Sequence, residues 1–139
     1  MDNIKPKLEW DNKYSVGVEV IDQQHQKMFT TINELIDTVS NYPTKEKVMG
    51  VVASLVEYKK FHFATEEKYF KDFNFDGADD HIAKHQQFSD KLVEIQNESG
   101  DDYVLFAFKL VDFLEDWLID HLMTTDQLYK DCFAAHGLK

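Results

Sequence analysis

Histidines interrupt the apolar stripes of four separate segments, at positions where buried hydrophobic side chains are expected. Two of these histidines have a polar partner four residues on, His62 with Glu66 and His81 with His85. Residues four apart on a helix point from one face, with Cβ atoms about 5–6 Å apart, so each pair can share one ion or bridge two. The full set of candidate metal ligands is His25, His62, Glu66, His81, His85, His121 and Asp126.

A single inward histidine has a simple structural explanation, a neutral imidazole hydrogen-bonded to a carbonyl or a carboxylate. That explanation weakens for five histidines that can share one layer. Burying Glu66 as a carboxylate without a cation costs several kcal/mol or more, and the inward stripes show no lysine or arginine to pair with it. A metal ion would satisfy every member, because neutral imidazole and ionised carboxylate are both ligand forms.

Asp126 is the weakest member of the set on spacing alone. It follows His121 by five residues, which places it about 140° from the His121 direction in a regular helix. If Asp126 belongs to the site, we expect a distorted backbone or a π-bulge between the two residues, a feature that often marks functional sites.

The number and type of donors narrow the choice of metal. Five nitrogens and two carboxylates are too many for one tetrahedral zinc ion, and they suit two metals of octahedral preference bridged by carboxylates and a solvent oxygen. Calcium and magnesium sites use oxygen donors and would not select imidazole. Nitrogen-rich ligation without thiolates favours iron, with manganese, copper and zinc as less favoured alternatives.

The elements that must position these residues are helices. Gly and Pro are scarce, and helix-breaking residues cluster around 41–43, 74–80 and 99–101. Apolar residues recur between them at three- and four-residue steps, including Ile82 in the third segment and Leu128 in the fourth. We therefore predict an all-α fold, an up-down-up-down antiparallel four-helix bundle with an N-terminal arm packed on it. The predicted ranges are about 22–40, 44–71, 79–98 and 102–130 for the helices and 1–20 for the arm.

Length and charge limit the alternatives. The 139 residues are expected to form a single domain, and a net charge of −11 argues against binding nucleic acid or a membrane surface. No secretory signal or membrane span is visible, and the one cysteine, Cys132, cannot form an internal disulfide. We expect a cytoplasmic protein.

Four sequence motifs resemble those of the hemerythrin family, most closely its short bacterial members. The stretch from Trp10 to His25 is similar to the family's opening, and the likeness covers nearly the whole chain. The other three motifs are His62-Phe63-Ala64-Thr65-Glu66-Glu67, His81-x-x-x-His85-x-x-Phe88 and Trp117-Leu118-x-x-His121-x-x-x-x-Asp126. Any one motif is a weak signal, whereas four in order are a strong one, and the family pattern supports the five-residue step to Asp126.

The resemblance implies a role for each candidate ligand. His81, His85 and His121 would hold one non-haem iron ion, and His25 and His62 a second one with an open position. Glu66 and Asp126 would bridge the two ions together with an oxo or hydroxo group. Dioxygen would bind at the open position.

We therefore expect reversible dioxygen binding, for oxygen storage, transport or delivery, with no catalytic residue. An oxygen-consuming enzyme is a candidate recipient. Two alternatives stay open: a di-iron enzyme (an oxidase, a peroxidase, or a nitric-oxide or iron-repair protein), and an oxygen sensor acting through a partner. Five imidazoles distinguish this chain from the carboxylate-rich ferritin-like oxidases. The expected absence of a further inward carboxylate or tyrosine beside the ligands also argues against an enzyme.

Overall fold

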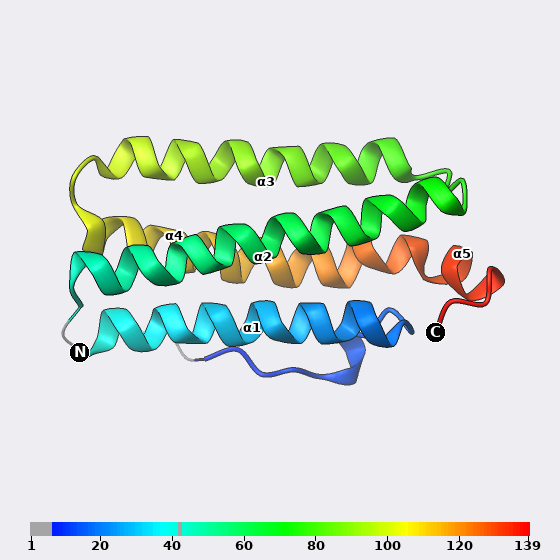
Figure 1. Ribbon diagram of the computed structural model, residues 1–139, viewed down its shortest axis with the longest axis horizontal. Coiled ribbons are helices and arrows are strands. Elements are labelled where there is room, and N and C mark those ends of the chain that lie inside the picture. Colours follow the sequence, from blue (N-terminus) through cyan, green and yellow to red (C-terminus); the bar gives the residue numbers. More distant parts are fainter. Residues whose placement is uncertain (1–6, 42) are drawn as a thin grey trace.

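The computed structural model describes residues 7–41 and 43–139, and four long helices lie alongside one another in it (Figure 1). The predicted all-α four-helix bundle is confirmed, and no strand occurs in the described ranges. The first six residues of the predicted arm, and Tyr42 in the first loop, lie outside those ranges. The long helices are α1 (Glu19–Ser40), α2 (Lys45–Asp72), α3 (Ala78–Ser99) and α4 (Tyr103–Asp120).

Local signals at the helix ends explain the short, sharp connections. Thr44 begins α2 by accepting a hydrogen bond from the amide of Lys47, and Asp102 begins α4 in the same way from Leu105. Gly100, between α3 and α4, has a φ of 55°, a left-handed conformation that glycine adopts without steric cost. Each connection is only a few residues long, so consecutive helices run antiparallel.

The inner faces of the four helices form one core. Helix α1 packs against α2 and α4, and α3 completes the bundle by packing against α4 and α2. The apolar stripes supply most of this core, but Ile82 is exposed and the adjacent His81 is buried in its place. The α3 stripe therefore begins with the two histidines rather than with a hydrophobic residue.

The described part of the arm packs on the bundle, as predicted. A 3₁₀ turn (Asn12–Tyr14) places Tyr14 against Trp10 and Phe29, with ring centroids 5.6–5.7 Å apart. The side chain of Asn33 on α1 bonds both the amide and the carbonyl of Leu8. None of the helices in the described ranges has both the length and the apolar character that crossing a membrane requires.

The predicted fourth helix, 102–130, is not one regular helix. Helix α4 ends at Asp120 and is followed by a π-turn (His121–Thr125), a 3₁₀ turn (Asp126–Tyr129) and the short α5 (Lys130–Ala135). The wider π-turn shifts the side-chain register of everything after it. Leu128, expected inside, is therefore 70% exposed, whereas Tyr129 and Phe133 are fully buried.

Leu110 tests the contribution of the core. It is completely buried on α4, and its replacement in Leu110→Ala should lower the free energy of unfolding by about 2–5 kcal/mol through lost burial and the cavity left behind. Urea unfolding of the metal-free protein measures this difference. The control Val93→Ala removes an exposed side chain on α3 and should change stability by less than about 0.5 kcal/mol. Equal effects of the two substitutions would contradict the assigned core.

Candidate metal centre

The structure brings all seven candidate ligands into one buried layer. Their donor atoms form two overlapping groups, and within each group the atoms lie within 4.8 Å of one another. Every member is buried, and Glu66 belongs to both groups. The first group is Glu66, His81, His85 and His121; the second is His25, His62, Glu66 and Asp126.

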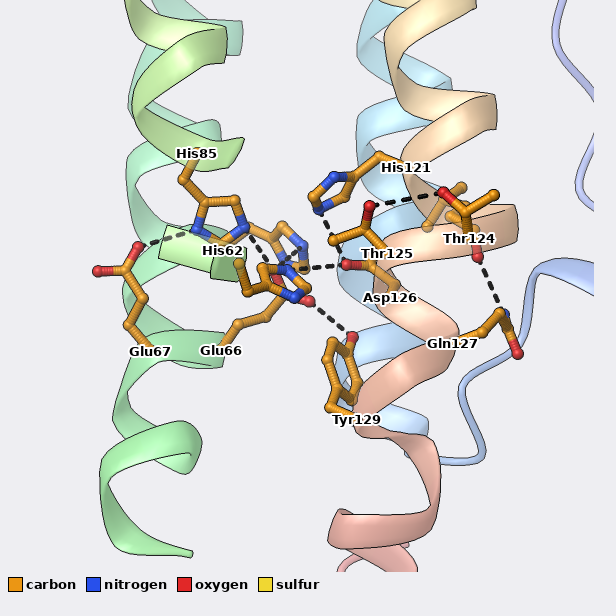
Figure 2. Close-up of polar contacts among 12 residues, drawn as sticks. His62, Glu66, Glu67, His85, His121, Thr124, Thr125, Asp126, Gln127 and Tyr129 are labelled. Atoms are coloured by element: carbon orange, nitrogen blue, oxygen red, sulfur yellow. Dashed lines mark hydrogen bonds and ion pairs between the residues drawn. The ribbon is translucent and has the colours of Figure 1, made fainter. Parts of the chain in front are cut away.

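The π-turn is what carries Asp126 into this layer, as the five-residue step from His121 required. Its carboxylate faces both groups: Oδ1 lies 2.9 Å from His121 Nε2 (Figure 2), and Oδ2 lies 3.2 Å from His25 Nε2. Oδ1 is also 3.0 Å from His81 Nε2. The expected backbone distortion is therefore confirmed, and it turns an outward position into an inward one.

Side-chain hydrogen bonds support the distorted backbone. The amide of Asp126 donates to the carbonyl of His121, the five-residue bond that defines a π-turn. Thr124 donates its hydroxyl proton to the carbonyl of Asp120 at 2.7 Å. The side-chain amide of Gln127 donates to the carbonyl of Leu122 at 3.0 Å and to that of Ser15 in the arm at 3.3 Å. The carbonyls of Asp120, just before the turn, and of Leu122, within it, therefore both accept side-chain hydrogen bonds.

Glu66 is held by a tyrosine that sequence reasoning missed. Its Oε1 lies 3.3 Å from His62 Nε2 and 3.2 Å from His85 Nε2, and its Oε2 accepts a hydrogen bond of 2.6 Å from the Tyr129 hydroxyl. The expectation of no inward tyrosine beside the ligands is therefore wrong. A regular helix from His121 would turn Tyr129 away, but Asp126 and Tyr129 are three residues apart and share a face beyond the π-turn.

Two further residues hold the outer nitrogens of the imidazoles. Gln24 Oε1 lies 2.8 Å from His62 Nδ1, and Glu67 Oε2 lies 2.9 Å from His85 Nδ1. An oxygen acceptor at Nδ1 keeps the proton there, which leaves Nε2 with a free lone pair directed into the layer. Both histidines are therefore held in the tautomer that binds metals.

Mutual electrostatics dominate the titration of the buried groups. Burial by itself would lower the pKa of His81, but the neighbouring Asp126 and Glu66 carboxylates outweigh it and raise that pKa to about 9. Burial would raise the pKa of Asp126, as would the nearby Glu66, but the surrounding imidazoles hold it well below its usual range. Burial and the adjacent His62 lower the pKa of His25. Burial would likewise raise the pKa of Glu66, but His62 and the other nearby imidazoles hold it well below its usual range. Both carboxylates thus stay ionised and need positive charge beside them.

Unsatisfied donor atoms indicate that metal ions fit this layer. Among the described residues, the buried Nε2 atoms of His81, His85 and His121, both oxygens of Asp126, and Glu66 Oε1 form no hydrogen bond of good geometry. The Nε2 atoms of His25 and His62 face each other at 3.0 Å. Lone pairs this close require a proton or a cation between them, and nitrogen and carboxylate donors are suitable ligands for a transition metal.

Lys59 does not supply that positive charge. It is only 6% exposed, so the expectation that no lysine lies on the inward stripes is wrong. Its ammonium donates to Ser89 Oγ at 2.9 Å and lies 5.4 Å from the centroid of the Phe88 ring. Within the described ranges no ion pair joins Lys59 to a carboxylate, and burial lowers its pKa. The need of Glu66 for a cation therefore remains.

Comparison with known proteins decides the family. The model of the hemerythrin HHE cation-binding domain matches residues 16–133, which include every candidate ligand. The chain belongs to the hemerythrin family. The predicted family is thus confirmed, and the match extends through the π-turn into α5.

Individual members of the family support this placement over most of the chain. A bacteriohemerythrin of Clostridium acetobutylicum is 28% identical over 88% of this chain and 98% of its own length. A myohemerythrin of Theromyzon tessulatum is 25% identical over 88% of this chain and 90% of its own. The crystal structure of a wild-type hemerythrin superposes with a TM-score of 0.74 at 25% identity, covering 91% of this chain and 98% of that one.

Tyr129→Phe tests the hydrogen bond to Glu66. Removing the hydroxyl leaves Glu66 Oε2 buried without its donor, so we expect the free energy of unfolding of the metal-free protein to fall by about 1–3 kcal/mol. The matched control is Tyr14→Phe, because Tyr14 is also buried but its hydroxyl makes no hydrogen bond to another described residue. If both variants lost the same stability in urea titrations, the bond would not support the layer.

Proposed function

We propose that this chain binds dioxygen reversibly at a di-iron centre, for oxygen storage, transport or delivery. The observation that carries the proposal is the division of the donor atoms into two groups with unequal numbers of histidines around a shared Glu66. In this assignment His81, His85 and His121 would hold one iron, and His25 and His62 would hold the other. Glu66 and Asp126 would supply carboxylate oxygens to both ions.

The inequality of the two groups provides a place for an external ligand. Because Glu66 and Asp126 would serve both ions in this assignment, the two-histidine position would have one protein donor fewer than the three-histidine position, and a metal of octahedral preference there would keep a position free. When bound, the iron pair would supply electrons to dioxygen and recover them when dioxygen leaves. A dioxygen carrier requires that this free position accept a small ligand and that water be largely excluded from it.

The surroundings of the layer are suited to excluding water. The Phe63 ring stacks on His85 at 3.7 Å between centroids, and the Trp117 ring stacks on His121 at 4.2 Å. Leu118 and Leu122 are fully buried on the same side of the chain's last long helix and the π-turn. A dry, apolar wall slows proton entry, and slow proton entry favours reversible release over onward chemistry.

A di-iron enzyme is the second candidate, and Tyr129 is the observation that favours it. Its hydroxyl lies 2.6 Å from Glu66, so a protic group reaches the ligand layer itself. Burial and the nearby carboxylates raise the pKa of Tyr129 well above its usual range, which keeps the proton on the oxygen. A retained phenolic proton is a stabilising donor for Glu66, and we therefore rank the carrier first.

An optical cycle separates the two candidates. We expect the protein loaded anaerobically with ferrous iron to contain about two irons per chain and to be colourless. Air should produce a visible charge-transfer band, and removal of dioxygen should abolish it through repeated cycles, as the spectrum recorded at each step would show. A band that does not reverse, or iron that is permanently oxidised in the first exposure to air, would favour the enzyme.

His25→Ala tests which group holds the open position. Loss of one of only two histidines should abolish dioxygen binding and reduce the iron content from about two to about one per chain. The control His136→Ala removes a histidine that is exposed near the C-terminus and lies outside the layer. Circular dichroism checks that both variants stay helical. Unchanged dioxygen binding in His25→Ala would contradict the assignment.

A further inference from the structure

The two groups of donors differ in the side chain that accepts a hydrogen bond from the outer nitrogen of one of their histidines. In the three-histidine group, His85 donates its outer Nδ1–H to the carboxylate of Glu67 at 2.9 Å. In the two-histidine group, His62 donates its outer proton to the side-chain amide oxygen of Gln24 at 2.8 Å. The lengths are almost equal, but one acceptor carries a full negative charge and the other carries none.

The neutral acceptor is fixed in its orientation by its neighbours. Gln24 Nε2 donates to Thr65 Oγ1 at 3.3 Å, and the Thr65 hydroxyl donates its own proton to the carbonyl of Phe61 at 3.0 Å. Thr65 can therefore only accept from Gln24, so the amide nitrogen points to Thr65 and the amide oxygen to His62. Gln24 is buried, and this network gives His62 an uncharged partner.

Glu67, the charged acceptor, is not neutralised by a second ion-pair partner in the described part of the chain. The Glu67 side chain is 36% exposed, and His85 is its only ion-pair partner in the described part of the chain. The outer nitrogens of His25 and His81 have no hydrogen-bond partner among the described residues, and no second carboxylate accepts from a ligand's outer nitrogen there. The contrast between the groups therefore rests on Gln24 and Glu67.

The charge of the hydrogen-bond acceptor changes how strongly the imidazole donates to a metal. A carboxylate at Nδ1 draws the proton outward and leaves more electron density on Nε2, which makes the imidazole a stronger donor to a metal. A stronger donor stabilises the ferric state over the ferrous state, because the ferric ion carries the higher charge. A neutral amide oxygen polarises the imidazole less and therefore stabilises the ferric state less.

We propose that Gln24 and Glu67 are positioning residues that make the two iron positions electronically unequal, so that the iron held by His81, His85 and His121 gives up its electron first. This inference rests on the ligand assignment of the proposed function. Removal of one electron by an electrode would turn one ferrous ion into a ferric ion at the three-histidine position. Removal of the second electron, at higher potential, would oxidise the two-histidine position.

Exchanging the two acceptors tests the inference with little change of shape. Glu67→Gln keeps an oxygen acceptor but removes its charge, and should raise the potential of the first oxidation step. Gln24→Glu adds a charge and should lower the potential of the second. In the double exchange the ferric ion should move to the two-histidine position. Spectroelectrochemistry gives both potentials, and Mössbauer spectra of the half-oxidised protein show which position is ferric.

Two control variants make the same charge changes away from the histidines. Glu57→Gln removes an exposed carboxylate from α2, and Gln96→Glu adds one to an exposed position of α3. If Glu67→Gln behaved like Glu57→Gln, or if the double exchange left the ferric ion in place, the inference would be overturned. Glu67 is partly exposed, so Glu67→Gln decides the question even where Gln24→Glu fails to fold.

A second measurement uses cobalt(II) instead of iron and requires no dioxygen. Glu67→Gln should speed the removal of one of two bound cobalt ions by a chelator by about 10–100-fold, whereas Glu57→Gln should not. An iron-loaded protein that fails to release dioxygen would overturn the carrier function and leave both measurements standing. Reversible dioxygen binding with no effect of either exchange would overturn this inference alone.

Discussion

Two ionised carboxylates buried at the centre of a helical bundle set the main constraint on this structure. Glu66 and Asp126 are fully buried, and burying a charge costs several kcal/mol or more unless it is compensated. Within the described ranges the chain surrounds them with imidazoles rather than with lysine or arginine. Imidazoles can carry protons when no metal is bound and donate lone pairs when one is, so the layer is suited to exchanging protons for metal ions.

The bundle meets this constraint by departing from regular helical geometry at one place. The π-turn (His121–Thr125) brings His121 and Asp126 to the same layer although they are five residues apart. The same shift turns Tyr129 inward, where its hydroxyl bonds Glu66, and turns Leu128 out to solvent. One local distortion therefore supplies a candidate ligand, a supporting hydrogen bond and a change of packing register.

A second set of contacts determines the tautomer and the donor strength of the candidate ligands. Gln24, Glu67 and Tyr129 touch candidate ligands from behind and are not themselves members of the two donor groups. They hold two histidines in the metal-binding tautomer and occupy one oxygen of Glu66. Because Glu67 is charged and Gln24 is neutral, this support is unequal between the two groups. Hydrogen bonds of this kind make otherwise similar imidazoles different donors.

Spacing along single helices made much of this protein predictable: the helical fold, the pairs His62–Glu66 and His81–His85, and even the distortion before Asp126. Each depends on residues within a few turns of one another, where periodicity alone decides the shared face. The inward turn of Tyr129, the buried Lys59 and the pairing of Gln24 with His62 escaped that reasoning. Gln24 and His62 lie on different helices, and the register beyond His121 follows the π-turn rather than a regular period. The sequence by itself thus determined most of the side chains that face inward along regular helices, with Lys59 and Ile82 as exceptions. Only the packing of those helices decided which atoms meet.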